Sequence, residues 1–433
     1  MTPRETPVVK TGETVRGSFV RVSGGLAVYT ACQWAIVAVL AKLGTPELVG
    51  QYAFAVALTT PVLMLAQMNL RAVLATDVHE THAFREYRNL RYLLLALGML
   101  VIVGLALFQK TPQEGGHEGG NDRFFVVFLV GLIQAGEWVS DIFQGRMQQQ
   151  GFTGRTAPSM IARGLLGIAA LAVALRLTGN LVTALAWMLV ARTAVLFAYD
   201  STYAMRGFHH DGPAPSFAEQ RRAQWDLVKK ALPLGVVLML AALFLNTPRY
   251  FIAASLGERA LGVFSALISL TTAANLIVNS LGQSATTRLA RLHSAGDVKG
   301  FFRLSMKMVG LAVALGIFGL FCAATIGPWA VSLVYRKEYA QQGSLLVIAM
   351  GSASIGFVAA LFGYTITAAR RFTQQMPLQA ACLAATTLAA YLLVPRMGLN
   401  GAAISIGIGS LVQTLGEAWI LRDVLAEMKR VRG

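Results

Sequence analysis

The chain has 433 residues, of which 55% are hydrophobic and only 13% are charged, and its mean hydropathy is +0.57. Soluble domains carry about 25% charged residues, so this composition excludes an ordinary soluble enzyme and predicts that most of the chain lies in lipid. The formal net charge of +16 would favour nucleic acid as the partner of a soluble protein. In a membrane protein Lys and Arg set the orientation instead, so we expect a lipid bilayer and no nucleic acid.

Residues 1–17 are polar, and the first apolar stretch is too long for the apolar core of a cleavable signal peptide, so we expect the first span itself to direct insertion. Apolar runs then recur along the chain, each long enough to cross a hydrocarbon core of roughly 30 Å at 1.5 Å per residue. The sequence therefore predicts an all-α polytopic membrane protein with twelve transmembrane helices. The predicted spans are 18–42, 48–76, 90–109, 124–145, 157–177, 180–204, 231–254, 261–288, 304–327, 341–367, 374–394 and 400–421.

The distribution of Lys and Arg between the loops predicts the orientation. The two termini and the even-numbered loops hold 24 of the 37 cations, and the odd-numbered loops hold eight. Because cytoplasmic loops are enriched in Lys and Arg, both termini are expected in the cytoplasm.

The chain divides into two halves that are related by a repeat. Residues 205–230 form the longest polar connection, so we expect an N-lobe over 1–204, a cytoplasmic linker over 205–230 and a C-lobe over 231–433. An offset of 212 residues places Gly50-Gln51-Tyr52-Ala53 over Gly262-Val263-Phe264-Ser265. The second and eighth spans, to which these segments belong, cross the membrane in the same direction. This indicates a parallel repeat with a central cavity and a transport site between the lobes.

Polar side chains follow one face of several predicted spans. The second span carries Gln67 and Arg71, and the repeat superimposes these residues on Asn279 and Gln283 of the eighth span. The fourth span carries Glu137 and Asp141 at helical spacing. Neutral amides in lipid can serve as interhelical hydrogen-bonding groups, whereas charged side chains there are costly and indicate a function.

Five arginines of the predicted spans are candidate site residues: Arg21, Arg71, Arg163, Arg192 and Arg249. The first four are expected to share the cytoplasmic half of the N-lobe, whereas Arg249 follows Pro248 toward the periplasmic end of its helix. A guanidinium group binds phosphate oxygens through two hydrogen bonds and stays charged. The alternative is that these side chains reach toward lipid headgroups.

The acids Glu137, Asp141 and Glu417 can pair with these arginines or bind a coupling cation, either H⁺ or Na⁺. No cofactor is expected. Cys32, Cys322 and Cys382 lie singly within predicted helices and His117 lies in a Gly-rich loop, so the sequence offers no set of metal ligands.

Several segments resemble Wzx-type oligosaccharide flippases, which share a superfamily with the lipid II flippase MurJ and the MATE exporters. The resemblance rests on Asn246–Ile252, Leu261–Leu267, Glu338–Ala340 and Gly398–Ala403 and extends over most of the chain. It implies two V-shaped lobes around a central cavity and transport by alternating access. The substrate-binding residues expected on this basis are Arg21, Arg71, Arg163, Arg192, Arg249, Gln67, Asn246, Asn279 and Gln283, with Glu137, Asp141 and Glu417 in coupling or gating.

The expected substrate is an undecaprenyl-diphosphate-linked oligosaccharide that moves to the periplasmic leaflet for O-antigen or exopolysaccharide synthesis. We expect a monomer, with a polysaccharide polymerase and chain-length complex as protein partners. Two alternatives remain. A MATE-like exporter of organic cations would favour a cavity lined by acids, and a membrane glycosyltransferase or polymerase on the same carrier would need a larger periplasmic loop than this sequence offers.

Overall fold

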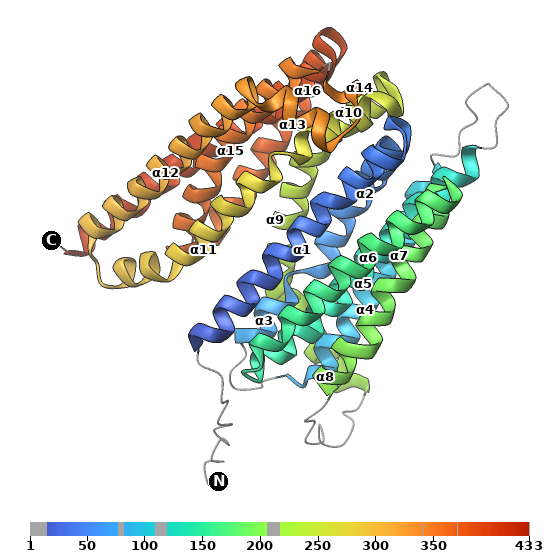
Figure 1. Cartoon of the computed structure of the whole chain (residues 1–433). Coiled ribbons are helices and arrows are strands. Elements are labelled where there is room, and N and C mark those ends of the chain that lie inside the picture. The colour runs from blue at the N-terminus through green and yellow to red at the C-terminus, as the bar shows by residue number, and fades with distance from the viewer. Residues whose placement is uncertain are drawn as a thin grey trace.

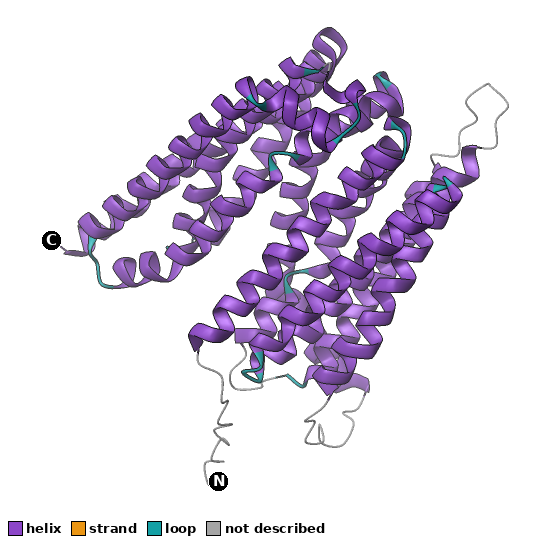
Figure 2. Ribbon diagram, viewed as in Figure 1, coloured by secondary structure: helices purple, strands orange, loops and turns teal. Residues whose placement is uncertain are grey.

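A computed structural model describes residues 15–76, 82–108, 119–205, 217–340, 342–369 and 371–432 (Figure 1). Within these residues every regular element is a helix (Figure 2). A helix satisfies its own backbone hydrogen bonds, which is the condition for crossing lipid, and the predicted all-α class is confirmed.

The first half of the chain forms a bundle that we call the N-lobe. Its elements are α1 (Val15–Leu43), α2 (Pro46–Gln67), α3 (Leu70–Thr76), α4 (Phe84–Phe108), α5 (Gly119–Gln149), the 3₁₀ turn η1 (Thr153–Arg155), α6 (Thr156–Thr178), α7 (Leu181–Val195), the π-helical segment η2 (Leu196–Ser201) and α8 (Thr202–Met205).

The second half forms the C-lobe, which packs beside the first (Figure 1). Its elements are α9 (Phe217–Ser255), α10 (Gly257–Ser269), α11 (Thr272–Ser294), α12 (Val298–Thr325), α13 (Gly327–Val334), α14 (Lys337–Ala340), α15 (Gly343–Ala368) and α16 (Phe372–Arg432).

The helix α16 is two antiparallel helices that meet at Gly398, whose φ of 59° and ψ of −133° are not helical. The backbone of Gly401 lies against Leu393, and that of Gly416 lies against Leu378. Ten described stretches are long and apolar enough to cross a membrane, and the pair α10–α11, bent by 47°, adds one more. With the two helices of α16 taken separately, the described residues contain the twelve predicted spans.

The second span is broken between α2 and α3. Met68 and Asn69 have positive φ values of 45° and 51°, which end α2 in a left-handed turn. The side-chain oxygen of Gln67 accepts a hydrogen bond from the Asn69 backbone N–H at 3.2 Å. The break redirects α3 and therefore decides where Arg71 lies.

The lobes meet at the end of the molecule opposite the first residues of α1, and they diverge toward the end where α1 begins (Figure 1). A Cβ atom added to Gly50 of α2 would lie 2.0 Å from the carbonyl oxygen of Glu258, and one added to Gly262 of α10 would lie 1.8 Å from that of Pro46. These contacts follow the predicted repeat, since an offset of 212 residues relates both Gly50 to Gly262 and Pro46 to Glu258. Glycine at both positions permits the close approach.

The predicted linker 205–230 differs from the structure in its second half. Residues 206–216 lie outside the described residues, but Phe217 already begins α9. Leu227 and Ala231 are buried against the N-lobe, one helical turn apart. Their apolar contact explains why a charged segment continues the helix instead of forming a loop.

Candidate functional site

The N-lobe encloses a cavity of about 490 Å³, which we call the arginine cavity. Helices α1, α2, α5, α6 and α7 contribute to its wall, together with Arg71 of α3. Its polar lining consists of Tyr29, Gln33, Tyr52, Thr60, Arg71, Gln134, Glu137, Asp141, Gln144, Arg163 and Arg192.

Glu137 of α5 joins two arginines inside this cavity. Its Oε2 lies 2.8 Å from Arg163 Nη1, and its Oε1 lies 2.9 Å from Arg192 Nη1. Both arginine side chains are almost fully buried, with 5% and 6% of their surface exposed. Arg192 Nη2 also donates to Gln33 Oε1 at 2.8 Å, so the amide of α1 holds the guanidinium from a further side.

Asp141, one helical turn along α5, makes a second pair of contacts. Its Oδ1 lies 3.0 Å from Arg71 Nη1, and its Oδ2 lies 3.6 Å from Arg91 Nη2. Arg71 also donates to Gln144 and Gln148, so three successive turns of α5 position it. Glu137 and Asp141 share one face of α5, as their spacing predicts.

A third acid, Asp200, completes the cluster. Arg163 Nε lies 3.9 Å from Asp200 Oδ2, and the same oxygen accepts a hydrogen bond from Ser140. Asp200 is fully buried and lies in the π-helical segment η2, a type of distortion that often occurs at functional sites. The cluster therefore contains four arginines and three acids, which gives it an excess of positive charge.

Arg91 and Asp200 were not predicted as site residues. Arg91 stands at the start of the predicted span 90–109, and the structure places it inside α4 with no exposed surface. The signal in the sequence was the helical spacing of Phe84, Tyr87 and Leu90, all buried on the same side of the helix as Arg91. Asp200 could have been found as a charged side chain within a predicted span.

A second cavity, of about 720 Å³, lies between the lobes; we call it the central cavity. Gln33, Tyr52, Val56 and Thr60 line both cavities, so the two spaces adjoin along α1 and α2. Apart from one arginine, the described residues that line the C-lobe wall of the central cavity are uncharged. Its polar members include Asn246, Asn275, Asn279, Gln379, Gln413, Ser265, Ser269, Ser352 and Ser410. Phe244 and Phe264 add aromatic surface to this wall, and Trp34 of α1 adds it on the N-lobe side.

Arg249 is the cation on this wall. Pro248 interrupts the hydrogen bonding of α9 just before it, and Arg249 Nη1 donates to Asn246 Oδ1 at 2.5 Å. Among the described residues no carboxylate lies within ion-pair distance of Arg249. In each lobe an arginine thus donates to an amide oxygen, Arg249 to Asn246 and Arg192 to Gln33. Of these two arginines, only Arg192 also contacts an acid among the described residues.

The remaining predicted site residues lie apart from the arginine cluster. Arg21 is exposed on α1 and bonds to Gly17 of its own helix, and Gln283 is exposed on α11. Gln67 is buried at the end of α2, where it caps the break. Asn279 lines the central cavity and accepts from Tyr364 at 3.4 Å.

The predicted acid Glu417 lies in the C-lobe, away from the arginines. It is 4% exposed, and its Oε1 accepts from Gln413 at 3.1 Å. Its Oε2 has no hydrogen-bond partner among the described residues. Glu417 is therefore a buried acid without a described cation beside it.

Comparison with known proteins agrees with this architecture. Residues 15–293 match the family model described as polysaccharide biosynthesis protein. The chain is 23% identical over 397 residues to the Staphylococcus aureus protein described as capsular polysaccharide biosynthesis protein CapF, covering 91% of this chain and 96% of that one.

Among solved structures, an inward-facing multidrug resistance MATE family transporter of the MOP superfamily is similar with a TM-score of 0.71 and 18% identity, covering 96% of this chain and all of that one. An outward-facing MATE structure gives 0.63 and 16% identity, with 96% and 97% covered. The fold is that of the MATE transporters, and the chain is a multi-pass membrane protein. By its sequence match it belongs to the polysaccharide biosynthesis protein family.

Proposed function

We propose that the protein is a flippase that moves a polyprenyl-diphosphate-linked oligosaccharide from the cytoplasmic to the periplasmic leaflet of the bacterial inner membrane. The substrate has two chemically different polar parts, a doubly charged diphosphate and a neutral sugar chain. The observation that carries the proposal is the pair of adjoining cavities, one lined by three arginines and the other lined mainly by amides, hydroxyls and aromatic rings.

The arginine cavity suits the diphosphate. Arg71, Arg163 and Arg192 each present a guanidinium group to one space, and such groups bind phosphate oxygens through two hydrogen bonds. The arginines are already held by Glu137 and Asp141, so they do not need to be ordered when the ligand arrives. Such preorganisation lowers the cost of binding.

The central cavity suits the sugar. Asn279, Gln379 and Gln413 offer both donors and acceptors, as sugar hydroxyls require, and Trp34 provides a flat apolar surface. A MATE-like exporter of organic cations would have to place its cation beside the arginine cluster and Arg249. The sign of the charge opposes that alternative.

Alternating access is supported by the arrangement of the lobes, which meet at one end and diverge at the other. With 24 of the 37 Lys and Arg on the side of the termini, the diverging end would face the cytoplasm. Cysteine labelling tests this orientation: Gly120→Cys should react with a membrane-impermeant reagent from the periplasm and Asp211→Cys should not. The reverse pattern at both positions would contradict it.

Coupling can use the same acids. Arginines left unpaired in an empty cavity would be costly within the membrane, so pairing with Glu137, Asp141 and Asp200 lowers that cost. We propose that diphosphate displaces these acids, with uptake of H⁺ or Na⁺. Flipping by the Asp141→Asn protein should then lose its dependence on an imposed pH or sodium gradient, and an unchanged dependence would argue against the idea.

The decisive test is transport by purified protein in liposomes. A fluorescent lipid-linked oligosaccharide should move between leaflets only when the protein is present, without new glycosidic bonds, and a protein with both Arg71→Ala and Arg192→Ala should not move it. Formation of glycosidic bonds would support the glycosyltransferase alternative. Absence of movement by the folded wild-type protein would overturn the flippase proposal.

A further inference from the structure

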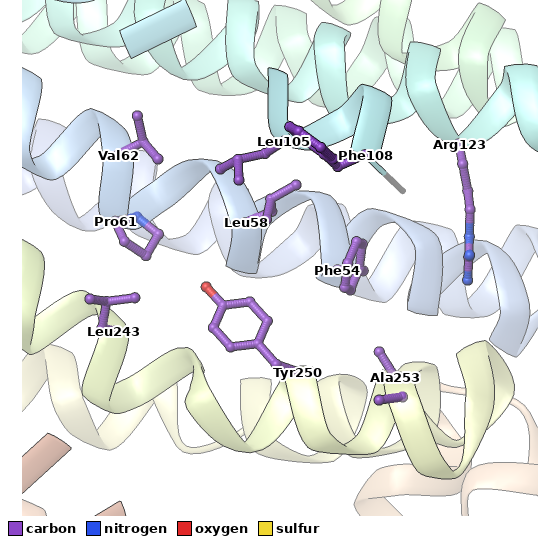
Figure 3. Close-up of a pocket in the computed structure, with 11 residues that line it drawn as sticks. Phe54, Leu58, Pro61, Val62, Leu105, Phe108, Arg123, Leu243, Tyr250 and Ala253 are labelled. Atoms are coloured by element: carbon purple, nitrogen blue, oxygen red, sulfur yellow. The ribbon is translucent and has the colours of Figure 1, made fainter. Parts of the chain in front are cut away.

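A third hollow, of about 640 Å³, opens between the lobes (Figure 3); we call it the seam groove. Phe54, Leu58, Pro61 and Val62 of α2 form its floor. They follow one helix face over about 12 Å at 1.5 Å per residue. The two walls belong to different lobes: Leu105, Phe108 and Arg123 on one side, and Leu243, Tyr250, Ala253 and Ala254 of α9 on the other.

The groove and the central cavity lie on opposite sides of one wall, which α2 and α9 form together. On α2, Val56 and Thr60 face the central cavity while Leu58 and Pro61 face the groove. On α9, Arg249 faces the cavity and the next residue, Tyr250, faces the groove. Separation of α2 from α9 would therefore join a polar space directly to an apolar one.

One hydrogen bond holds this wall at its centre. Pro61 lacks a backbone N–H, so the carbonyl oxygen of Ala57, four residues before it, loses its partner within the helix. The hydroxyl of Tyr250 donates to that oxygen at 2.5 Å. Tyr250 belongs to the other lobe, so this bond can break when the lobes move apart. Its loss leaves the hydrogen bonds within α2 unchanged, because the Ala57 carbonyl oxygen has no backbone partner inside that helix.

The groove has a cation at the end where the lobes meet. Arg123, near the start of α5, lines it there, and 41% of its side chain is exposed. Arg123 Nε lies 2.5 Å from Glu258 Oε1 of α10, so this contact also joins the lobes. Apart from Arg123 and the Tyr250 hydroxyl, the lining is apolar, which matches an occupant with a long apolar chain and an anionic end.

We propose that the seam groove is the outer-leaflet binding site of the carrier lipid, with its isoprenoid chain along α2 and its diphosphate at Arg123. This inference rests on the proposed function, because it assigns a place to the apolar part of that substrate. When α2 and α9 part, the sugar still lies on the side of the central cavity, while the chain enters the groove and the diphosphate reaches Arg123. Parting of the wall then releases the lipid sideways.

Photolabelling of the purified protein in phosphatidylcholine nanodiscs tests the site. The probe is a polyprenyl diphosphate with a benzophenone on its chain, and the labelled residues are mapped by mass spectrometry. Labels are expected on α2, α4 and α9 within the groove. Unlabelled polyprenyl diphosphate should compete, whereas phosphatidylglycerol at the same concentration should not.

Variants sharpen the test. Ala254→Trp, at the exposed edge, should abolish groove labelling, while the matched control Val190→Trp, on the exposed face of α7, should not change it. Arg123→Gln should weaken labelling about tenfold, as expected for the loss of a hydrogen bond to a charged group. Glu258→Gln removes the same ion pair but leaves the arginine, so labelling should persist.

Competition by phosphatidylglycerol equal to that by polyprenyl diphosphate would show that the groove holds ordinary membrane lipid and would overturn the inference. Labelling outside the groove, or equal loss in the Arg123→Gln and Glu258→Gln proteins, would also overturn it. These failures are distinct from failure of the proposed function. Flipping in liposomes with an unlabelled groove would leave the flippase proposal in place and remove only this site.

Discussion

The two lobes derive from one repeat, but they handle charge in different ways. In the N-lobe each of three acids, the partly buried Glu137 and Asp141 and the fully buried Asp200, lies within 4 Å of at least one arginine, at distances of 2.8 to 3.9 Å. In the C-lobe Arg249 faces an amide, and Glu417 is buried without a described cation beside it. The two halves of the repeat therefore share the path of their helices but differ in the charged side chains that face the cavities.

The difference is what we expect if the two lobes bind different parts of the proposed substrate. Three arginines of the N-lobe line the cavity where a diphosphate would bind, and acids between them keep these arginines paired when the site is empty. A neutral wall in the other lobe can contact a sugar chain without holding it too tightly for release. The predictions below separate these roles, beginning with the largest expected effect.

The Glu137→Gln protein should lose the most stability. The substitution leaves Arg163 and Arg192 buried without a full counter-charge, and breaking a buried pair costs about 3–5 kcal/mol. Chemical unfolding in detergent should show the loss. The matched variant in the other lobe, Glu417→Gln, removes an acid with no described cation and should leave stability unchanged or higher. Equal losses in the two proteins would remove the distinction between the lobes.

Substrate binding should depend on the N-lobe arginines. Arg71→Ala or Arg192→Ala should weaken the affinity for a polyprenyl diphosphate by about 1.5–3 kcal/mol, because each removes a hydrogen bond to a charged group. Lysine at either position should restore only part of the affinity, since its ammonium group lacks the planar guanidinium geometry that binds two phosphate oxygens at once. Titration calorimetry measures the change, and Arg176→Ala, exposed on α6, is the control. Unchanged affinity in both alanine proteins would take these residues out of the site.

Substitutions in the C-lobe wall should change the affinity for the sugar part of the substrate and not the affinity for its diphosphate. Asn279→Ala should lower the affinity for a lipid-linked oligosaccharide by about 1 kcal/mol, the contribution of one neutral hydrogen bond. Affinity for the same lipid without sugar should not change. Ser280→Ala, on the next residue of α11, serves as the control. A loss that is equal for both ligands would contradict the division between the two walls.

The smallest effect concerns the ion pair that joins the lobes. Glu47 Oε1 lies 3.1 Å from Arg259 Nη1, and the repeat relates these two positions to each other. Both side chains are partly exposed, so the pair should contribute roughly 0.2–1 kcal/mol. In a double-mutant cycle on unfolding free energy, Glu47→Arg and Arg259→Glu should each destabilise, and their combination should recover the part due to this pair. The part due to Glu338, which lies 3.0 Å from Arg259 Nη2, should stay lost. Additive losses would show that the pair does not couple the lobes.

Much of the candidate site could be predicted from the sequence, and the wrong predictions have one cause. Arg71, Arg163, Arg192, Glu137 and Asp141 were recognised because charge in an apolar span is visible in the sequence itself. Arg21 was expected in the same group, but it is exposed on α1, and Arg91 took its place. Depth in the membrane can be counted along a helix, whereas the direction in which a side chain points depends on how that helix is rotated against its neighbours.

The sequence by itself determined the helical class, the twelve spans, the repeat and the kinds of charge in the membrane, because each depends on composition and periodicity along a continuous stretch. Only the tertiary structure decided which charges meet. The break at Met68 and Asn69 turns Arg71 toward α5, the π-helical segment places Asp200 beside Ser140, and the crossing of α2 and α9 separates the central cavity from the seam groove. These contacts join residues distant in sequence, so their partners depend on helix packing angles that no local pattern encodes.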